Sequence, residues 1–118
     1  MLRSQIGCWN SYVGVVDPLP EVLLVDDGSP RTRAVDIVRE AGCAIPIKVF
    51  RIQEDIPWNF SGARNLACTH ANGWIFMSDI DTIMLAEQAQ AFLRAQPLER
   101  RFFYMPRRTW LLHKEKAT

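Results

Sequence analysis

Two carboxylates one residue apart, Asp79 and Asp81, are the side chains of this sequence best suited to chemistry. They follow a run of four large apolar residues, Trp74–Met77, that begins after Gly73. Such a run is typical of a strand buried on both faces, and residues i and i+2 of a strand point to the same side. Two carboxylates brought together in this way favour a proton or a cation between them. Hard divalent ions, Mg²⁺ or Mn²⁺, take oxygen ligands and are often shared with substrate phosphates.

The alternative for Asp79 and Asp81 is a polar turn in which one aspartate caps the next helix. An isolated pair of aspartates would favour this alternative, so the rest of the chain has to decide between the two.

A second pair of carboxylates, Asp26 and Asp27, ends another apolar run, Val22–Val25. The segment Gly28–Pro30 then supplies a residue that permits a tight turn, a helix cap and a residue suited to the first helical position. Strand, acidic turn and helix form half of a parallel α/β unit, and such sheets bind ligands beyond the carboxyl ends of their strands. Asp26 and Asp27 are therefore candidates for ligand binding, with turn formation alone as an equal alternative.

Arg64 is the third candidate. It lies in the first turn of a predicted helix that begins at Asn59 or Ser61 and extends to about Asn72. A cation at this end of a helix is unfavourable to the helix dipole, which indicates that Arg64 serves an anion. The alternative is a solvent-exposed arginine without a ligand.

The elements expected to position these residues alternate along the chain. We expect helices over residues 2–14, 30–41 and 59–72 and around Leu85–Leu93 before Pro97, with strands at 22–25, at 45–52 on a sheet edge, at 74–77 and at Phe102–Met105. This order predicts an α/β fold, a three-layer sandwich with a mostly parallel sheet.

Composition places the chain among ordinary globular proteins. With 118 residues it is expected to form a single domain over 1–118, and a net charge of +1 argues against a nucleic-acid partner. No apolar run approaches membrane-spanning length, and the N-terminus lacks the apolar core of a signal peptide. Cys8, Cys43 and Cys68 lack metal-ligand spacing, so we expect free thiols in a reducing compartment, the cytoplasm.

Three segments in order, Glu21–Ser29, Gly62–Ala67 and Ala71–Asp81, resemble the nucleotide-sugar-binding half of the GT-A glycosyltransferases, especially the inverting family 2 enzymes. The resemblance implies a partial GT-A fold, which is Rossmann-like. It also implies a glycosyltransferase-like domain that binds a nucleoside diphosphate sugar, with a uridine diphosphate sugar as the expected donor, for transfer to an unknown acceptor.

The resemblance also implies roles for the candidate residues. Asp26 and Asp27 would be the contacts to the nucleotide base, and Arg64 would belong to the nucleotide site. Asp79 and Asp81 would contact the ribose and hold Mn²⁺ or Mg²⁺ against the diphosphate. An ion at that position would neutralise the charge on the departing phosphate as a Lewis acid.

The sequence departs from the family pattern at both ends. Family members begin with a strand that ends near P-x-Y-N, and they continue into an acceptor half that supplies a catalytic carboxylate. This sequence starts at a helix, and its later acids Glu87, Glu99 and Glu115 lack the context of that base. We therefore expect a domain without the first strand and the acceptor half. The catalytic residue of this domain is unknown. The favoured function is a metal-dependent transferase, and without a general base it is expected to have little or no activity alone.

Two other functions compete with this interpretation. The stronger is a non-catalytic, truncated GT-A-like module for binding or assembly, in which the carboxylates persist as turn formers. The weaker is a haloacid-dehalogenase-like hydrolase, whose D-x-D signature the following Thr82 and Ile83 fit only in part. A dinucleotide-binding domain would need G-x-G-x-x-G after a strand, which the sequence lacks.

The missing first strand has a consequence for assembly. Val22–Val25 and Trp74–Met77 would have to pair directly, or borrow Phe102–Met105 from a second copy, because unpaired buried backbone groups each cost about 1–3 kcal/mol. We therefore expect a rearranged sheet and a homodimer formed by strand exchange.

Overall fold

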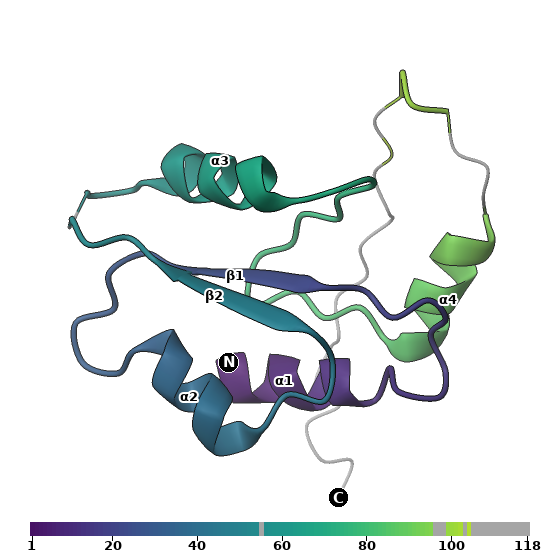
Figure 1. The fold of residues 1–118 in the computed structure, drawn as a ribbon, viewed down its shortest axis with the longest axis horizontal. Coiled ribbons are helices and arrows are strands. Elements are labelled where there is room, and N and C mark those ends of the chain that lie inside the picture. Colours follow the sequence, from purple (N-terminus) through teal and green to yellow (C-terminus); the bar gives the residue numbers. More distant parts are fainter. Residues whose placement is uncertain (55, 96–98, 103, 105–118) are drawn as a thin grey trace, which may run out of the picture.

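The computed structural model describes residues 1–54, 56–95, 99–102 and 104. In this part the chain forms, in order, α1 (Leu2–Asn10), β1 (Val22–Asp26), α2 (Ala34–Ala41), β2 (Ile47–Arg51), α3 (Phe60–His70) and α4 (Ala86–Arg94) (Figure 1). The two strands pair in parallel, from Val22 opposite Ile47 to Asp26 opposite Arg51, and α2 connects them. The predicted parallel strand–helix–strand unit is confirmed. In these ranges every helix is too short or too polar to cross a lipid bilayer.

The helices lie on both sides of the two strands. Figure 1 shows α3 on one side, where it packs on β1, and α1 and α2 on the other, where they pack on each other. This arrangement is that of a partial α/β fold. Because the sheet of the described residues has two strands, the wider three-layer sandwich with a mostly parallel sheet stays a prediction.

One buried cluster of side chains joins the turns after α1, the loop before β2 and α4. The buried cluster consists of Tyr12, Val16, Ile45 and Ala89. The Tyr12 hydroxyl and the Cys8 thiol both donate hydrogen bonds to the carbonyl oxygen of Met84. Burial and the neighbouring Cys8 thiol together raise the pKa of Tyr12 to about 12. This cluster therefore fixes the first helix against the chain that follows Asp81.

Three helices are shorter than predicted; α3 ends at His70 instead of about Asn72, and α1 and α2 differ more from the prediction. α1 ends at Asn10, because the residues after it form tighter turns and Gly14 takes a left-handed φ of 80°. α2 begins at Ala34 and not at Pro30. The intervening loop is instead folded around the Asp26 carboxylate, which bonds backbone N–H groups at both ends of it.

The predicted strand at Trp74–Met77 is wrong. This segment has no regular secondary structure, and the ladder of the described residues joins only β1 and β2. Its four side chains are each 46–48% exposed. A strand needs a neighbour that supplies hydrogen bonds and covers its apolar side chains, and composition alone does not provide one. Asp79 and Asp81 consequently lie in a turn, and Val22–Val25 does not pair directly with Trp74–Met77.

The last predicted strand, Phe102–Met105, falls partly outside the described residues. Pro97, the predicted end of the fourth helix, lies outside them. Phe102 and Tyr104 are described and have no regular secondary structure. Residues 103 and 105 lie outside the described ranges, so strand exchange through this segment stays a prediction.

Candidate functional site

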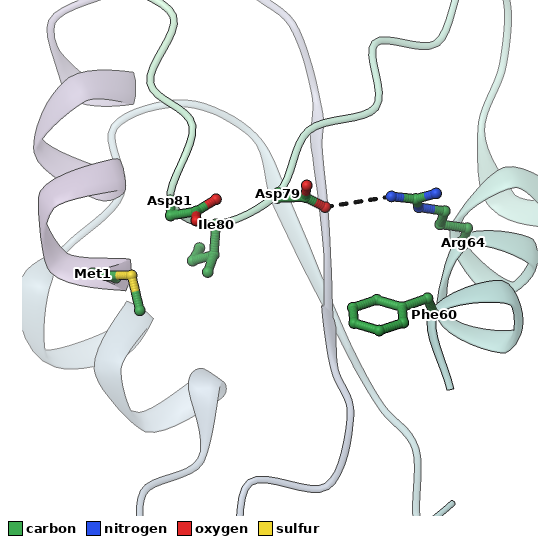
Figure 2. Close-up of a pocket in the computed structure, with 6 residues that line it drawn as sticks. All are labelled: Met1, Phe60, Arg64, Asp79, Ile80 and Asp81. Atoms are coloured by element: carbon green, nitrogen blue, oxygen red, sulfur yellow. Dashed lines mark hydrogen bonds and ion pairs between the residues drawn. The ribbon is translucent and has the colours of Figure 1, made fainter. Parts of the chain in front are cut away.

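Three of the predicted site residues, Arg64, Asp79 and Asp81, line one open pocket of about 620 Å³ (Figure 2). Arg64 projects from α3, and the two aspartates project from the turn that follows Trp74–Met77. The apolar lining of the pocket comes from Phe60, Ile80 and Met1. The family resemblance implied a nucleotide and metal site for these three charged side chains, and the fold brings them together in one pocket.

Asp79 faces Arg64 across the pocket. Nη2 of Arg64 lies 3.4 Å from Oδ1 of Asp79, as the dashed line of Figure 2 marks. Both side chains remain about half exposed, at 57% and 51%. An exposed ion pair of this kind is weak and easily exchanged for another partner.

The turn that carries Asp81 is held by Gln5, a residue of α1 that the sequence reasoning missed. Gln5 is 4% exposed, and its Nε2 donates hydrogen bonds to the carbonyl oxygens of Ile80, at 2.9 Å, and Thr82, at 2.5 Å. These two carbonyls flank Asp81, so one amide group fixes the backbone on both sides of it. No local signal in the sequence indicates this role, because the two acceptors lie more than 70 residues away. Cys8 on α1 and Tyr12 in the turn after it likewise donate to the distant carbonyl oxygen of Met84.

The carboxylate of Asp26 is engaged inside the fold. Its side chain is 1% exposed, and it accepts hydrogen bonds from the N–H groups of Ser29 and Ala34, both at 2.9 Å. Nη1 of Arg51 lies 3.4 Å from Oδ2 of Asp26. Burial acts to raise the pKa of Asp26, but these hydrogen bonds and the guanidinium bring it below its ordinary value.

Arg51 is a second residue that the sequence reasoning missed. It stands directly opposite Asp26 in the parallel ladder, and its Nη2 also donates to the carbonyl oxygen of Ser29 at 3.2 Å. The predicted strand bounds, 22–25 and 45–52, do not give this register, so the pairing of Arg51 with Asp26 emerges only from the structure. The guanidinium and the Asp26 carboxylate together hold the loop that follows β1.

Asp27 differs from Asp26. It is exposed, and within the described ranges its side chain makes neither an ion pair nor a hydrogen bond. Asp26 and Asp27 both stand at the carboxyl end of β1, and neither lines the pocket of Arg64, Asp79 and Asp81. The structure therefore separates the predicted residues into two groups.

A comparison with protein families identifies the family of the chain. Residues 7–108, most of the chain, match the model of glycosyl transferase family 2. The chain belongs to glycosyl transferase family 2. The match contains all three segments on which the resemblance was based, and it confirms that resemblance. No curated protein and no solved structure gave a significant match.

Membership in glycosyl transferase family 2 implies the GT-A fold, a role in glycosyl transfer and a nucleotide-sugar donor. The pocket can be compared with what such a donor requires. A cationic side chain forms strong, charge-assisted hydrogen bonds to a phosphate group, and Arg64 supplies such a side chain. The hydrolase alternative has no support from this comparison.

The chemistry of the donor set decides whether a divalent ion fits the family 2 pocket. Asp79 and Asp81 contribute two carboxylates, and elsewhere in the described ranges no three His, Cys, Asp or Glu side chains gather as a metal site. Mg²⁺ and Mn²⁺ bound together with a substrate need only one or two carboxylates, because phosphate oxygens and water complete the shell. The residues present therefore fit an ion shared with a diphosphate, and they do not form a closed metal centre.

Proposed function

We propose that this chain binds a nucleoside diphosphate sugar, through a divalent ion at Asp79 and Asp81, for transfer of the sugar to an acceptor. The observation that carries the proposal is the meeting of these carboxylates with Arg64 in one pocket of a family 2 chain. Carboxylates suit the ion and a guanidinium suits the diphosphate, so the pocket offers both halves of the expected recognition. The donor we propose is a uridine diphosphate sugar, with Mn²⁺ or Mg²⁺.

Each residue has a distinct part in this proposal. Asp79 and Asp81 hold the ion, and Asp79 also contacts the ribose. When bound, the ion neutralises charge on the departing diphosphate as a Lewis acid. Arg64 donates charge-assisted hydrogen bonds to the same diphosphate. Asp27, the exposed member of its pair, contacts the base, while Asp26 keeps the loop in place.

The alternative function is a module that binds the nucleotide sugar without transferring it. Both carboxylates of the pocket are assigned to the ion, so we assign no general base. The exposure of the pocket favours this alternative. The side chains of Arg64 and Asp79 are 57% and 51% exposed, whereas transfer to an acceptor in preference to water requires a site that excludes water.

Calorimetry with Mn²⁺ and a uridine diphosphate sugar tests the proposal. Wild-type protein should bind the sugar nucleotide in a Mn²⁺-dependent manner, and Asp81→Ala should abolish that dependence. Glu40→Ala is the matched control, since it removes an exposed carboxylate on α2 that pairs only with Arg3 in the described ranges. Equal binding by wild type and Asp81→Ala would refute the metal site. Release of uridine diphosphate in the presence of candidate acceptors separates a transferase from a binding module.

We further propose that the chain forms a homodimer by strand exchange and resides in the cytoplasm. Within the described ranges one edge of β1 has no partner strand, and an unpaired edge is a template for another chain. Light scattering on the purified protein should give twice the mass of the monomer. The cytoplasmic location is supported by three free cysteines.

A further inference from the structure

In this structure the first carboxylate of the proposed metal site already has a cationic partner. The guanidinium of Arg64 lies against Asp79, whereas Asp81 lies on the other side of Ile80, toward α1 (Figure 2). A divalent ion that approaches the pocket alone must therefore compete with Arg64 for Asp79. It also meets two carboxylates and one guanidinium, so the local charge is less negative than two carboxylates alone would give.

The contact between Arg64 and Asp79 is one that a ligand can replace. It is a single contact at 3.4 Å between half-exposed groups, and pairs of this kind contribute little to stability. A diphosphate offers Arg64 a partner of higher charge with paired oxygens, which a guanidinium binds more strongly. Arg64 can therefore leave Asp79 when a diphosphate enters, and Asp79 is then free for the ion.

We propose that Arg64 is a displaceable counter-ion that makes binding of the divalent ion depend on the diphosphate. Without nucleotide it occupies Asp79 and weakens ion binding; with nucleotide it moves to the diphosphate. This inference rests on the proposed function, because it assigns the same pocket to the ion and the diphosphate. The inference has a consequence that an ordinary phosphate-binding arginine does not have. Removing the charge of Arg64 should strengthen binding of the divalent ion and weaken binding of the diphosphate.

The first measurement is the affinity for Mn²⁺ alone, read from the loss of the free-ion signal in electron paramagnetic resonance. Arg64→Gln should bind Mn²⁺ up to about fivefold more tightly than wild type, the range expected for an exposed ion pair. Arg64→Lys keeps the positive charge and should resemble wild type. Arg39→Gln is the charge-matched control, since it removes an exposed arginine that pairs with Asp36 on α2 and does not line the pocket.

The second measurement is the affinity for uridine diphosphate with Mn²⁺ in excess. Here Arg64→Gln should bind about tenfold or more weakly than wild type, because a charge-assisted hydrogen bond to the diphosphate is lost. Arg39→Gln should bind as wild type does. Circular dichroism confirms that each variant is folded, which is expected because Arg64 is 57% exposed.

The two measurements distinguish failure of the inference from failure of the proposed function. Unchanged or weaker Mn²⁺ binding by Arg64→Gln overturns the inference, whatever the nucleotide does. Tighter Mn²⁺ binding by Arg64→Lys, equal to that of Arg64→Gln, overturns it as well, because charge would then not be the cause. If wild-type protein does not bind uridine diphosphate with Mn²⁺, the proposed function fails, and the Mn²⁺ titrations still decide whether Arg64 competes for Asp79.

Discussion

The side-chain amide of Gln5 donates hydrogen bonds to the carbonyl oxygens on both sides of Asp81. Gln5 precedes Ile80 by 75 residues, so the bonds tie the first helix to the proposed metal-binding turn. Because Gln5 is almost fully buried, water cannot easily replace the amide. The backbone of the turn therefore depends on α1, an element outside the three recognised motif segments.

Replacing Gln5 by methionine keeps most of the side-chain volume and removes both donors. The free energy of unfolding should fall by about 1–3 kcal/mol, because two hydrogen bonds are lost and each contributes about 0.5–1.5 kcal/mol. Mn²⁺-dependent nucleotide binding should weaken, because the backbone at Asp81 is no longer fixed. Urea denaturation and calorimetry measure the two effects. Gln53→Met, at an exposed position, is the control, and wild-type behaviour of Gln5→Met would contradict this role for the amide.

The parallel unit around β1 was predictable because its signals are local. The apolar run Val22–Val25, the turn at Gly28 and the helical spacing that follows each act over a few residues. The contact between Asp26 and Arg51 was not predictable in the same way, because it depends on the register between two strands. The prediction placed the start of α2 at Pro30, but α2 begins at Ala34. A residue that favours the first helical position does not outweigh a loop folded around the buried carboxylate of Asp26.

The candidate site shows the same division between local and distant information. The family resemblance implied that Arg64, Asp79 and Asp81 belong to the nucleotide and metal site, and the three side chains line one pocket. Gln5 carried no local signal, because its partners are more than 70 residues away. Trp74–Met77 was mispredicted because burial of an apolar run depends on which elements pack beside it.

Asp26 and Asp27 should respond differently to the same substitution. Asp26→Asn should lower the free energy of unfolding by about 1–3 kcal/mol, because an amide nitrogen replaces one buried acceptor. Asp27→Asn should leave stability within about 0.5 kcal/mol of wild type, as expected at an exposed site, and should weaken nucleotide binding. Urea denaturation and calorimetry on both variants test this division. A stable Asp26→Asn protein that has lost nucleotide binding would reverse the assignment.

Asp26 should also contribute to the dependence of stability on acid. Although burial raises its pKa, hydrogen bonds from Ala34, Ser29 and Arg51 leave the folded-state pKa below the ordinary value. The folded state thus binds this proton more weakly than the unfolded state, and the stabilisation is complete above the ordinary aspartate pKa of about 3.9 and lost as the pH falls below it. The difference in stability between wild type and Asp26→Asn should shrink from about pH 6 to about pH 2.5. A difference independent of pH would show that the charge of Asp26 does not matter.

Tyr12 should contribute to the dependence of stability on alkaline pH, because its pKa is raised whereas that of Asp26 is lowered. Burial is the main reason that its pKa rises from 10.0 to about 12, and the Cys8 thiol adds to the shift. The folded state therefore holds the phenol proton more tightly than the unfolded state. The resulting stabilisation is complete below pH 10.0 and is lost as the pH rises toward about 12. Tyr12→Phe lacks this contribution and the hydrogen bond to Met84. The difference in the free energy of unfolding between wild type and Tyr12→Phe should therefore decrease as the pH rises from 10.0 to about 12.

The tyrosine titration can be read from a single residue. The sequence has two tyrosines, so Tyr12 is the only one left in Tyr104→Phe. Its ultraviolet absorbance change on ionisation should have a midpoint near pH 12 in the folded protein. Urea-unfolded Tyr104→Phe is the control and should titrate near the ordinary tyrosine value of about 10. A midpoint near 10 in the folded protein would mean that Tyr12 is not buried against Cys8 and Met84, and that the contact between α1 and the chain after Asp81 is looser than the structure shows.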